Sequence, residues 1–169
     1  MSTPSHEPES IAWNSPVPKG FVVSSTVVTM TSPHAISKVW SWLNRMETFT
    51  KGQIFPYRVE FVGQEEDPSF SVGTYNNHHG PLLNLPAMIT VMDEPYYREM
   101  RYLYGSYVIT FRWIRPTELK FTLKEAADNT TEVTVELVAH TKPFIKGIWQ
   151  ALNRFFWRKG FGWWVKRLR

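Results

Sequence analysis

Short turns divide residues 57–141 into a series of strand-like segments, and this division constrains the fold more than any other feature of the sequence. The turns are marked by Gly80-Pro81, Glu94-Pro95, Gly105-Ser106, Arg115-Pro116 and Asp128-Asn129. The gaps between segments are too short for crossover helices, so the strands are expected to pair as an antiparallel meander. Residues 119–124 and 133–140 alternate between apolar and polar side chains. One face of this sheet must therefore be covered by another element.

A strand and a short helix are predicted before the meander. The segment 21–30 is apolar in both alternating registers, which predicts a strand covered on both faces. Ser32 and Pro33 then predict the start of a helix, with Ser32 as its cap. The apolar residues that follow share one helical stripe: Ile36, Val39, Trp40 and Leu43.

The closing segment, residues 142–169, is the long helix that is expected to cover the sheet. We expect residues 143–156 to face the sheet with one apolar stripe, made of Ile145, Ile148, Trp149, Leu152, Phe155 and Phe156. The second half forms a new stripe on roughly the opposite side, and it is predicted to point away from the core. It contains Trp157, Phe161, Trp164 and Leu168, flanked by Arg158, Lys159, Lys166 and Arg169.

The composition fits one globular domain. Of the 169 residues, 43% are hydrophobic and 15% aromatic, which excludes wholesale disorder and supplies a core. The first residues are rich in proline and lack an apolar run, so we expect a flexible arm at 1–19, no signal peptide and a single domain at 20–169. The sequence has no cysteine and no apolar run long enough to span a membrane. We therefore expect a cytoplasmic protein, peripheral at a membrane if the closing segment binds one.

Three segments give the chain a resemblance to a known superfamily. They are SPHAISKVWSWLNRMETFTKG (32–52), AMITVMDEPYYREMRY (87–102) and LKFTLKEAADNTTEVTVELVAHT (119–141). Over about residues 20–160 the chain resembles the START-like (SRPBCC) superfamily, which includes polyketide cyclase/dehydrase and lipid-transfer proteins. The resemblance implies an α+β, helix-grip fold: a curved antiparallel sheet of six to eight strands around a long C-terminal helix, with one or two short helices after the first strand. The chain departs from the usual pattern in one extra predicted strand and in the Trp/Arg-rich end.

The resemblance also implies a cavity between sheet and helix that holds a hydrophobic small molecule or lipid. If the aromatic residues of the sheet point inward, they form a wall with phenol groups for such a ligand; the alternative is that they only pack the core. The candidate ligand-binding residues are Tyr57, Tyr75, Tyr102, Tyr104, Tyr107, Trp113, Trp149, Leu152, Asn153 and Phe156. Glu99, Arg101 and Arg112 could orient a polar ligand head, although cross-strand ion pairs on the wet face are favoured.

His78 and His79 are the candidate catalytic residues. As neighbours on a strand they point to opposite faces and cannot easily chelate one ion, so no metal site is predicted. Either imidazole could serve as a general acid or base. This gives the alternative function, an enzyme resembling a polyketide cyclase, dehydratase or aromatase, with no cofactor implied. A solvated turn is the simpler interpretation of both histidines.

The charge of the closing segment leaves three alternatives for its partner. Residues 142–169 carry eight basic and no acidic residues, whereas residues 1–141 carry 11 basic and 15 acidic ones. Membrane-surface contact through Trp157, Arg158, Lys159, Phe161, Trp164, Lys166 and Leu168 fits the mixture of aromatic and basic residues. A homodimer contact, or packing against Trp13 of the arm, is the second alternative. Nucleic acid is disfavoured, because the sheet has the pattern of a pocket builder.

Overall fold

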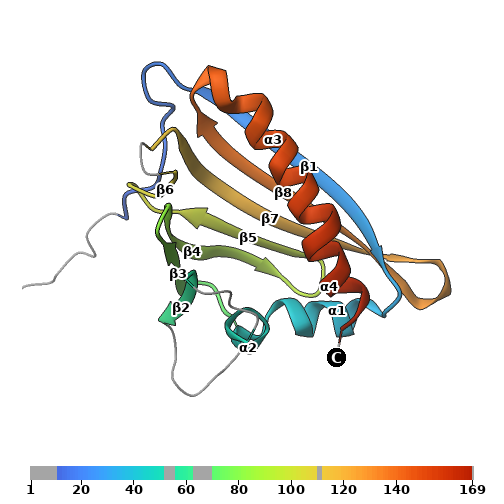
Figure 1. Ribbon diagram of the computed structural model, residues 1–169. Helices are drawn as coiled ribbons and strands as arrows, with labels where there is room; N and C mark the ends of the chain where they lie inside the picture. The colour runs from blue at the N-terminus through green and yellow to red at the C-terminus, as the bar shows by residue number, and fades with distance from the viewer. Residues whose placement is uncertain (1–10, 52–55, 63–69, 110–111, 169) are drawn as a thin grey trace, which may run out of the picture.

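The computed structural model describes residues 11–51, 56–62, 70–109 and 112–168. Within these residues the chain forms one eight-stranded sheet with helices on one of its faces (Figure 1). The strands are β1 (Val22–Ser32), β2 (Arg58–Val62), β3 (Tyr75–Gly80), β4 (Leu83–Asp93), β5 (Tyr97–Tyr102), β6 (Tyr107–Val108), β7 (Ile114–Ala126) and β8 (Thr130–Thr141). The helices are α1 (Ile36–Leu43), α2 (Met46–Thr50), α3 (Lys146–Phe155) and α4 (Gly162–Lys166), with short 3-10 or π segments η1 (Ala127–Asn129), η2 (Pro143–Ile145) and η3 (Phe156–Phe161).

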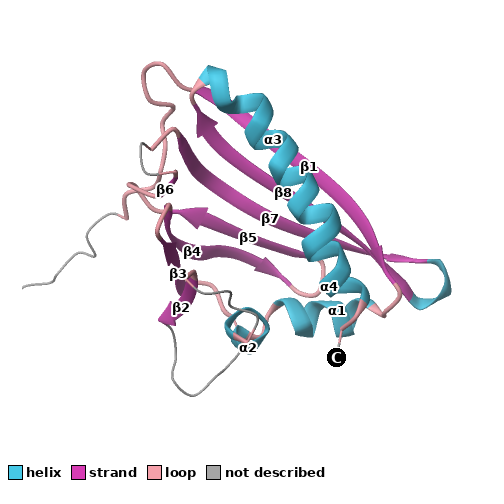
Figure 2. Cartoon of the chain, viewed as in Figure 1, coloured by secondary structure: helices cyan, strands magenta, loops and turns pink. Residues whose placement is uncertain are grey.

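The antiparallel meander predicted from the turns is confirmed. The strand order is β1-β8-β7-β5-β4-β3-β2, and β6 pairs with β4 and β7 beside this path. On β8, Val133, Val135 and Leu137 are buried and the residues between them are half-buried. We call the face that carries these three residues the inner face, since the helices lie on it (Figure 2). β1 pairs with β8 at one edge of the sheet, and β2 forms the other edge.

The outer face carries the cross-strand ion pairs that the sequence favoured. Lys120 Nζ lies 2.6 Å from Glu118 and 3.8 Å from Glu136. Arg101 lies 3.5 Å from Glu118 and 3.9 Å from Glu99. These five side chains are partly solvated and satisfy one another, so the Arg–Glu pair does not orient a ligand head on the inner face. Arg112, the third member of that prediction, stacks on the Tyr107 ring instead.

Two strand predictions and one turn prediction need correction. The extra strand, which the turns on either side of it predict at residues 107–114, is not formed in full: β6 has two residues, and the backbone leaves strand geometry at Ile109 and Arg112, where φ is 68° and 56°. The turn expected at Arg115-Pro116 lies inside β7, because a register shift between Pro116 and Glu118 accommodates the missing proline donor. The strand expected to be covered on both faces is the edge strand β1, whose outer residues Val23 and Val27 are exposed.

The short helix after β1 has the predicted buried stripe, Ile36, Val39, Trp40 and Leu43. Its predicted cap is wrong. Ala35 occupies the N-cap position and makes no side-chain cap bond. The Ser32 hydroxyl instead donates to the carbonyl oxygen of Val165 at 2.9 Å. This bond joins the end of β1 to α4, two segments at opposite ends of the sequence.

The C-terminal helix runs along β1 through α3, the π-helical turn η3 and α4. Its sheet-facing row contains Trp149, Asn153, Trp157, Phe161 and Val165. The predicted orientation of the two halves is therefore wrong, apart from Trp149, which was predicted to face the sheet and packs against the core. Phe161 is 2% exposed and packs at 5.7 Å from both Phe121 and Trp42, measured between ring centroids. The second half of the helix, expected to point away, closes the core.

Residues 11–19 lie against strands of the sheet. Trp13 forms a bridge with Leu103, and Arg101 stacks over its ring with 5.6 Å to the centroid. The buried Asn14 amide donates to the carbonyl oxygens of Ser106 and Pro116, at 3.2 and 2.8 Å. These contacts tie the described part of the arm to the loops at the β5–β7 end of the sheet.

Candidate functional site

An exposed apolar stripe runs along α3. It contains four of the six residues that the sequence placed against the sheet, with exposed fractions of 62% for Ile148, 59% for Leu152, 68% for Phe155 and 50% for Phe156. Phe144, in η2 just before α3, is also exposed. Large apolar side chains that gather on one helix without a protein cover commonly mark a binding surface. We call this set the α3 stripe.

The direction of the α3 stripe follows from the contacts on the opposite side of the helix. Gln150 Nε2 donates to the backbone oxygen of Ser25 on β1, the edge strand, at 3.0 Å. At about 100° per residue, the stripe lies on the other flank of the helix from Gln150. It therefore faces across the inner face, towards the side where β5, β4 and β3 lie (Figure 1).

The inner face at β3–β5 offers a mixture of apolar and polar groups. Strand pairing places Asn76 and His78 of β3 opposite Ala87 and Leu85 of β4, all on the inner face. Leu85 and Met100 are half-buried and pack at the margin of the core. The Asn76 amide donates to the sulfur of Met100 at 2.7 Å. This part of the sheet is incompletely covered by the described chain.

Only one of the two candidate catalytic histidines reaches the inner face. His79 points outward, 3.4 Å from Glu60 on β2, so its predicted place at the inner site is wrong. Water reaches the His78 side chain, but the surrounding protein desolvates its charged form. This desolvation, followed by the charge of His79, lowers the pKa of His78 from 6.5 to about 4. The His78 ring is therefore neutral at pH 7, with one donor and one acceptor nitrogen.

The predicted aromatic wall is not assembled. Of its residues, Tyr102 lies buried on the inner face, where desolvation raises the pKa of its phenol. Tyr104 is exposed, and Trp113 packs edge-on against Phe144 with 5.0 Å between ring centroids. Tyr75 pairs with Met88 on the outer face. The remaining positions scatter: Tyr57 against Gly80, Tyr107 beneath Arg112, Trp149 and Asn153 in the sheet-facing row, and Leu152 and Phe156 in the α3 stripe.

The predicted partner contacts of the second half of the helix divide into two groups. The apolar residues Trp157, Phe161 and Leu168 are buried in the core, so their outward placement is wrong. Trp164 is half-buried and packs against the same core. The cations of the prediction remain exposed: Arg158, Lys159 and Lys166. The groups of this segment that remain available for a surface contact include these cations and the exposed Trp163.

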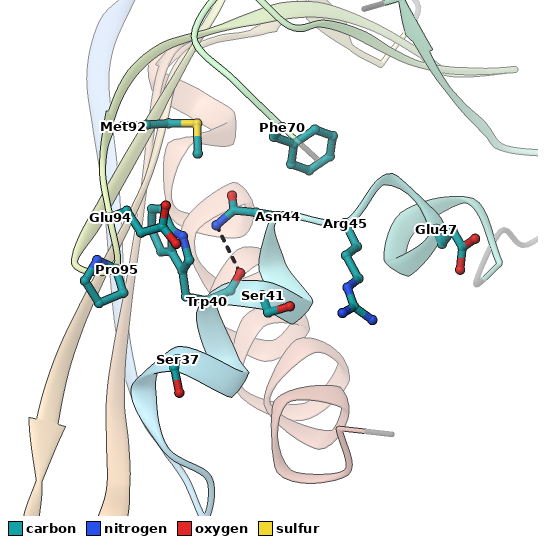
Figure 3. Close-up of a pocket in the computed structure, with 10 residues that line it drawn as sticks. All are labelled: Ser37, Trp40, Ser41, Asn44, Arg45, Glu47, Phe70, Met92, Glu94 and Pro95. Atoms are coloured by element: carbon teal, nitrogen blue, oxygen red, sulfur yellow. Dashed lines mark hydrogen bonds between the residues drawn. The ribbon is translucent and has the colours of Figure 1, made fainter. Parts of the chain in front are cut away.

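A pocket of about 680 Å³ that the sequence did not indicate lies between α1, the start of α2 and the β4–β5 turn (Figure 3). Asn44 links two sides of this pocket through its side chain and its backbone carbonyl. Asn44 Nδ2 donates to the Trp40 carbonyl oxygen at 3.0 Å, and the Asn44 carbonyl accepts from Phe70 N–H at 2.9 Å. The full lining is Ser37, Trp40, Ser41, Asn44, Arg45, Glu47, Phe70, Met92, Glu94 and Pro95.

Behind this pocket a buried guanidinium fixes the same loop. Arg98 is 4% exposed and donates to the Leu43 carbonyl at 2.6 Å and to Asn44 Oδ1 at 2.8 Å. Its charge lies over the rings of Phe70 and Phe121, at 5.1 and 4.8 Å from their centroids. Burial lowers the pKa of Arg98 to about 9. Both hydrogen bonds go to oxygens at the end of α1, so Arg98 connects β5 to α1 and has a structural role.

In the described part of the chain, no group of three or more acidic or histidine side chains could hold a metal ion. No described helix combines the length and the apolar character needed to cross a membrane.

The comparisons with known proteins rest on structure. No family model and no curated protein matches the sequence. Norcoclaurine synthase from Thalictrum flavum is similar with a TM-score of 0.60 and 12% identity, over 86% of each chain. Another structure of that enzyme is a complex with dopamine and hydroxybenzaldehyde.

Two further structures extend this likeness. Ara h 8.0201 is similar with a TM-score of 0.56 and 18% identity, over 85% of this chain and 95% of its own. The Aha1 dimer from Colwellia psychrerythraea has a TM-score of 0.54 and 12% identity, over 79% of this chain and 87% of its own. These proteins are helix-grip proteins of the START-like type, and the likeness covers most of each chain. The chain therefore has the START-like, helix-grip fold that the sequence resemblance implied.

Proposed function

We propose that the protein binds an apolar small molecule on the inner face of the sheet, between α3 and strands β3–β5. The observation that carries this proposal is the exposure of Leu152 and Phe156, which form the border of the α3 stripe nearest to the sheet. Because about half of each side chain is exposed, burying the rest under a ligand would contribute about 0.8–1.8 kcal/mol per residue. A ligand with a broad apolar surface would gain most from this arrangement.

The inner face supplies few polar groups for such a ligand. The neutral His78 ring can donate one hydrogen bond and accept another, and Asn76 stands beside it on the same strand. We expect the ligand to be mainly apolar, with a hydroxyl or carbonyl group at the β3 end. Hydroxybenzaldehyde, one of the compounds in the norcoclaurine synthase complex, likewise carries a hydroxyl and a carbonyl group on an apolar ring.

Binding of an environment-sensitive fluorescent probe such as anilinonaphthalene sulfonate tests the site, with native mass spectrometry for any co-purified ligand. Leu152→Asp should weaken probe binding at least about tenfold, because a carboxylate would be desolvated beneath the ligand. Val27→Asp is the matched control: Val27 is 54% exposed, but it lies on the outer face of β1. Equal binding by both variants would place the ligand elsewhere.

A second candidate is an enzyme of the cyclase or dehydratase type, and His78 is the observation that favours it. The neutral imidazole on the inner face could accept a hydrogen bond from a hydroxyl group of a bound substrate and orient it for reaction. In this case His78→Ala should lower turnover of a polyketide-type substrate while leaving its affinity nearly unchanged. His79→Ala, on the outer face, is the control. Equal turnover in the two variants would exclude His78 from catalysis.

A further inference from the structure

The outer border of the α3 stripe is formed by Phe144, Ile148 and Phe155, with exposed fractions of 65%, 62% and 68%. On a helical wheel Ile148 and Phe155 lie about 20° apart, on the side of the stripe that is turned away from the sheet. Apart from Trp113, which packs against Phe144, no described helix or strand is drawn over this outward side of α3 (Figure 1). The outer border is therefore separate from Leu152 and Phe156, which the proposed ligand would contact.

Exposed cations lie next to this border. Arg154 follows it on the helical wheel, at about 100° from Phe155 on the solvent side, and Arg158 is exposed in the adjoining η3. Lys159, Lys166 and Arg167 are exposed further along the helix. Within the described residues, none of these five side chains forms a salt bridge. The sequence has no acidic residue after Glu136, so nothing on this segment neutralises the charge.

We propose that this surface of α3 docks the protein onto the surface of an anionic lipid bilayer. An apolar helix border of Phe and Ile beside a row of unpaired Arg and Lys is the pattern of a helix that lies in the membrane interface. The apolar side chains enter the acyl boundary while the cations meet anionic headgroups. A protein partner of opposite charge could satisfy the cations, but the three large apolar side chains favour a fluid hydrophobic phase.

Vesicle co-sedimentation tests this proposal, with the full-length protein and two kinds of vesicle: phosphatidylcholine alone, and an equimolar mixture with phosphatidylglycerol. The protein should bind the anionic vesicles, and high salt should weaken the binding. The double variant Ile148→Asp/Phe155→Asp should lower the partition coefficient about tenfold or more. Arg154→Glu/Arg158→Glu should lower it about tenfold on anionic vesicles only.

Two variants control for the loss of charge and of apolar surface elsewhere. Lys124→Glu reverses an exposed cation on β7, and Val27→Asp changes an exposed apolar residue on the outer face. Both should bind vesicles as the unchanged protein does. Circular dichroism melts should be similar throughout, because all the changed side chains are exposed.

Several outcomes would overturn the proposal. Failure of the unchanged protein to bind anionic vesicles would do so, and so would variants that bind equally well. A dimer in analytical ultracentrifugation that Ile148→Asp/Phe155→Asp dissolves would assign this surface to a second copy of the chain. The probe assay with Leu152→Asp needs no vesicles, so it tests the proposed ligand site separately. A negative result with vesicles therefore does not contradict that site.

Discussion

Truncating two phenylalanines of the same helix, Phe161 and Phe155, tests which side of the C-terminal helix stabilises the fold. Phe161 is 2% exposed and Phe155 is 68% exposed. The Phe161 ring packs against Phe121, Trp42 and Trp157, with 5.7, 5.7 and 5.1 Å between centroids. Phe161→Ala therefore removes a ring from the core, whereas Phe155→Ala removes one from the surface.

The magnitudes follow from the buried areas. A buried aromatic side chain removes about 150–250 Å² from water, which corresponds to about 4–6 kcal/mol at 25 cal/mol per Å². Unfolded chains already bury part of this area, and measured Phe→Ala losses are about 3–5 kcal/mol. We expect Phe161→Ala to lower the free energy of unfolding by about 4 kcal/mol. We expect Phe155→Ala to lower it by about 1 kcal/mol or less, since alanine also favours the helix.

Urea denaturation followed by far-ultraviolet circular dichroism measures this difference without depending on tryptophan emission. The slope of the free energy against urea should stay constant across the unchanged protein and both variants. In thermal melts, a loss of about 4 kcal/mol in a chain of this size corresponds to a fall of about 8–16 °C. Equal losses in the two variants, or a larger loss for Phe155→Ala, would mean that the helix faces the sheet the other way round.

Two more predictions concern the histidine and the arm. Since the pKa of His78 is lower in the folded protein than in the unfolded chain, the unfolded chain takes up this proton first as the pH falls. Stability should therefore decrease as the pH falls from 6.5 towards 4, and His78→Gln should reduce this decrease in urea titrations more than His79→Gln does. Asn14→Ala leaves two buried carbonyl oxygens without their donor and should lower the free energy of unfolding by about 1–3 kcal/mol. Limited proteolysis should then cleave residues 11–19 earlier, and an unchanged cleavage rate would show that Asn14 does not hold the arm.

The spacing of apolar and polar residues predicted the elements of this fold well where one face of an element is exposed to solvent. The alternation in β8 and the stripe of α1 each separate buried from exposed residues without help from distant parts of the chain. The same period of two placed His78 and His79 on opposite faces, as observed. These patterns follow from the backbone geometry of strands and helices, so they do not depend on how the elements are arranged in the fold.

The pocket beside α1 had no comparable pattern in the sequence. Its polar junction needs Asn44 from the end of α1, Phe70 from the following segment and Arg98 from β5. The first and last of these are 54 residues apart in the chain. In the sequence, Arg98 stands next to Glu99 and close to Arg101, so it could equally belong to the ion pairs of the outer face. The register of β5 against β4 decides the question: Arg98 pairs with Met92, and this places its side chain on the inner face.

The C-terminal helix was misjudged because its sheet-facing row is not its most apolar one. Trp149, Asn153, Trp157, Phe161 and Val165 follow one another at steps of four residues, and the polar Asn153 interrupts the row. Asn153 is 6% exposed and donates to the Trp149 carbonyl at 2.8 Å, so its amide is satisfied within the helix and can lie inward.

The π-helical turn η3 explains why a row with this spacing stays on one face. In a regular α-helix, steps of four residues drift by about 40° each around the axis, so the row would leave the sheet after three steps. A π turn holds more residues than an α turn, so each residue turns the chain through a smaller angle. The π turn at Phe156–Phe161 thereby reverses this drift. The α3 stripe, which is the more apolar row on an α-helical wheel, is thereby left without a protein cover and faces across the inner face. The surface that the two proposals use is thus a consequence of how the second half of the helix fills the core.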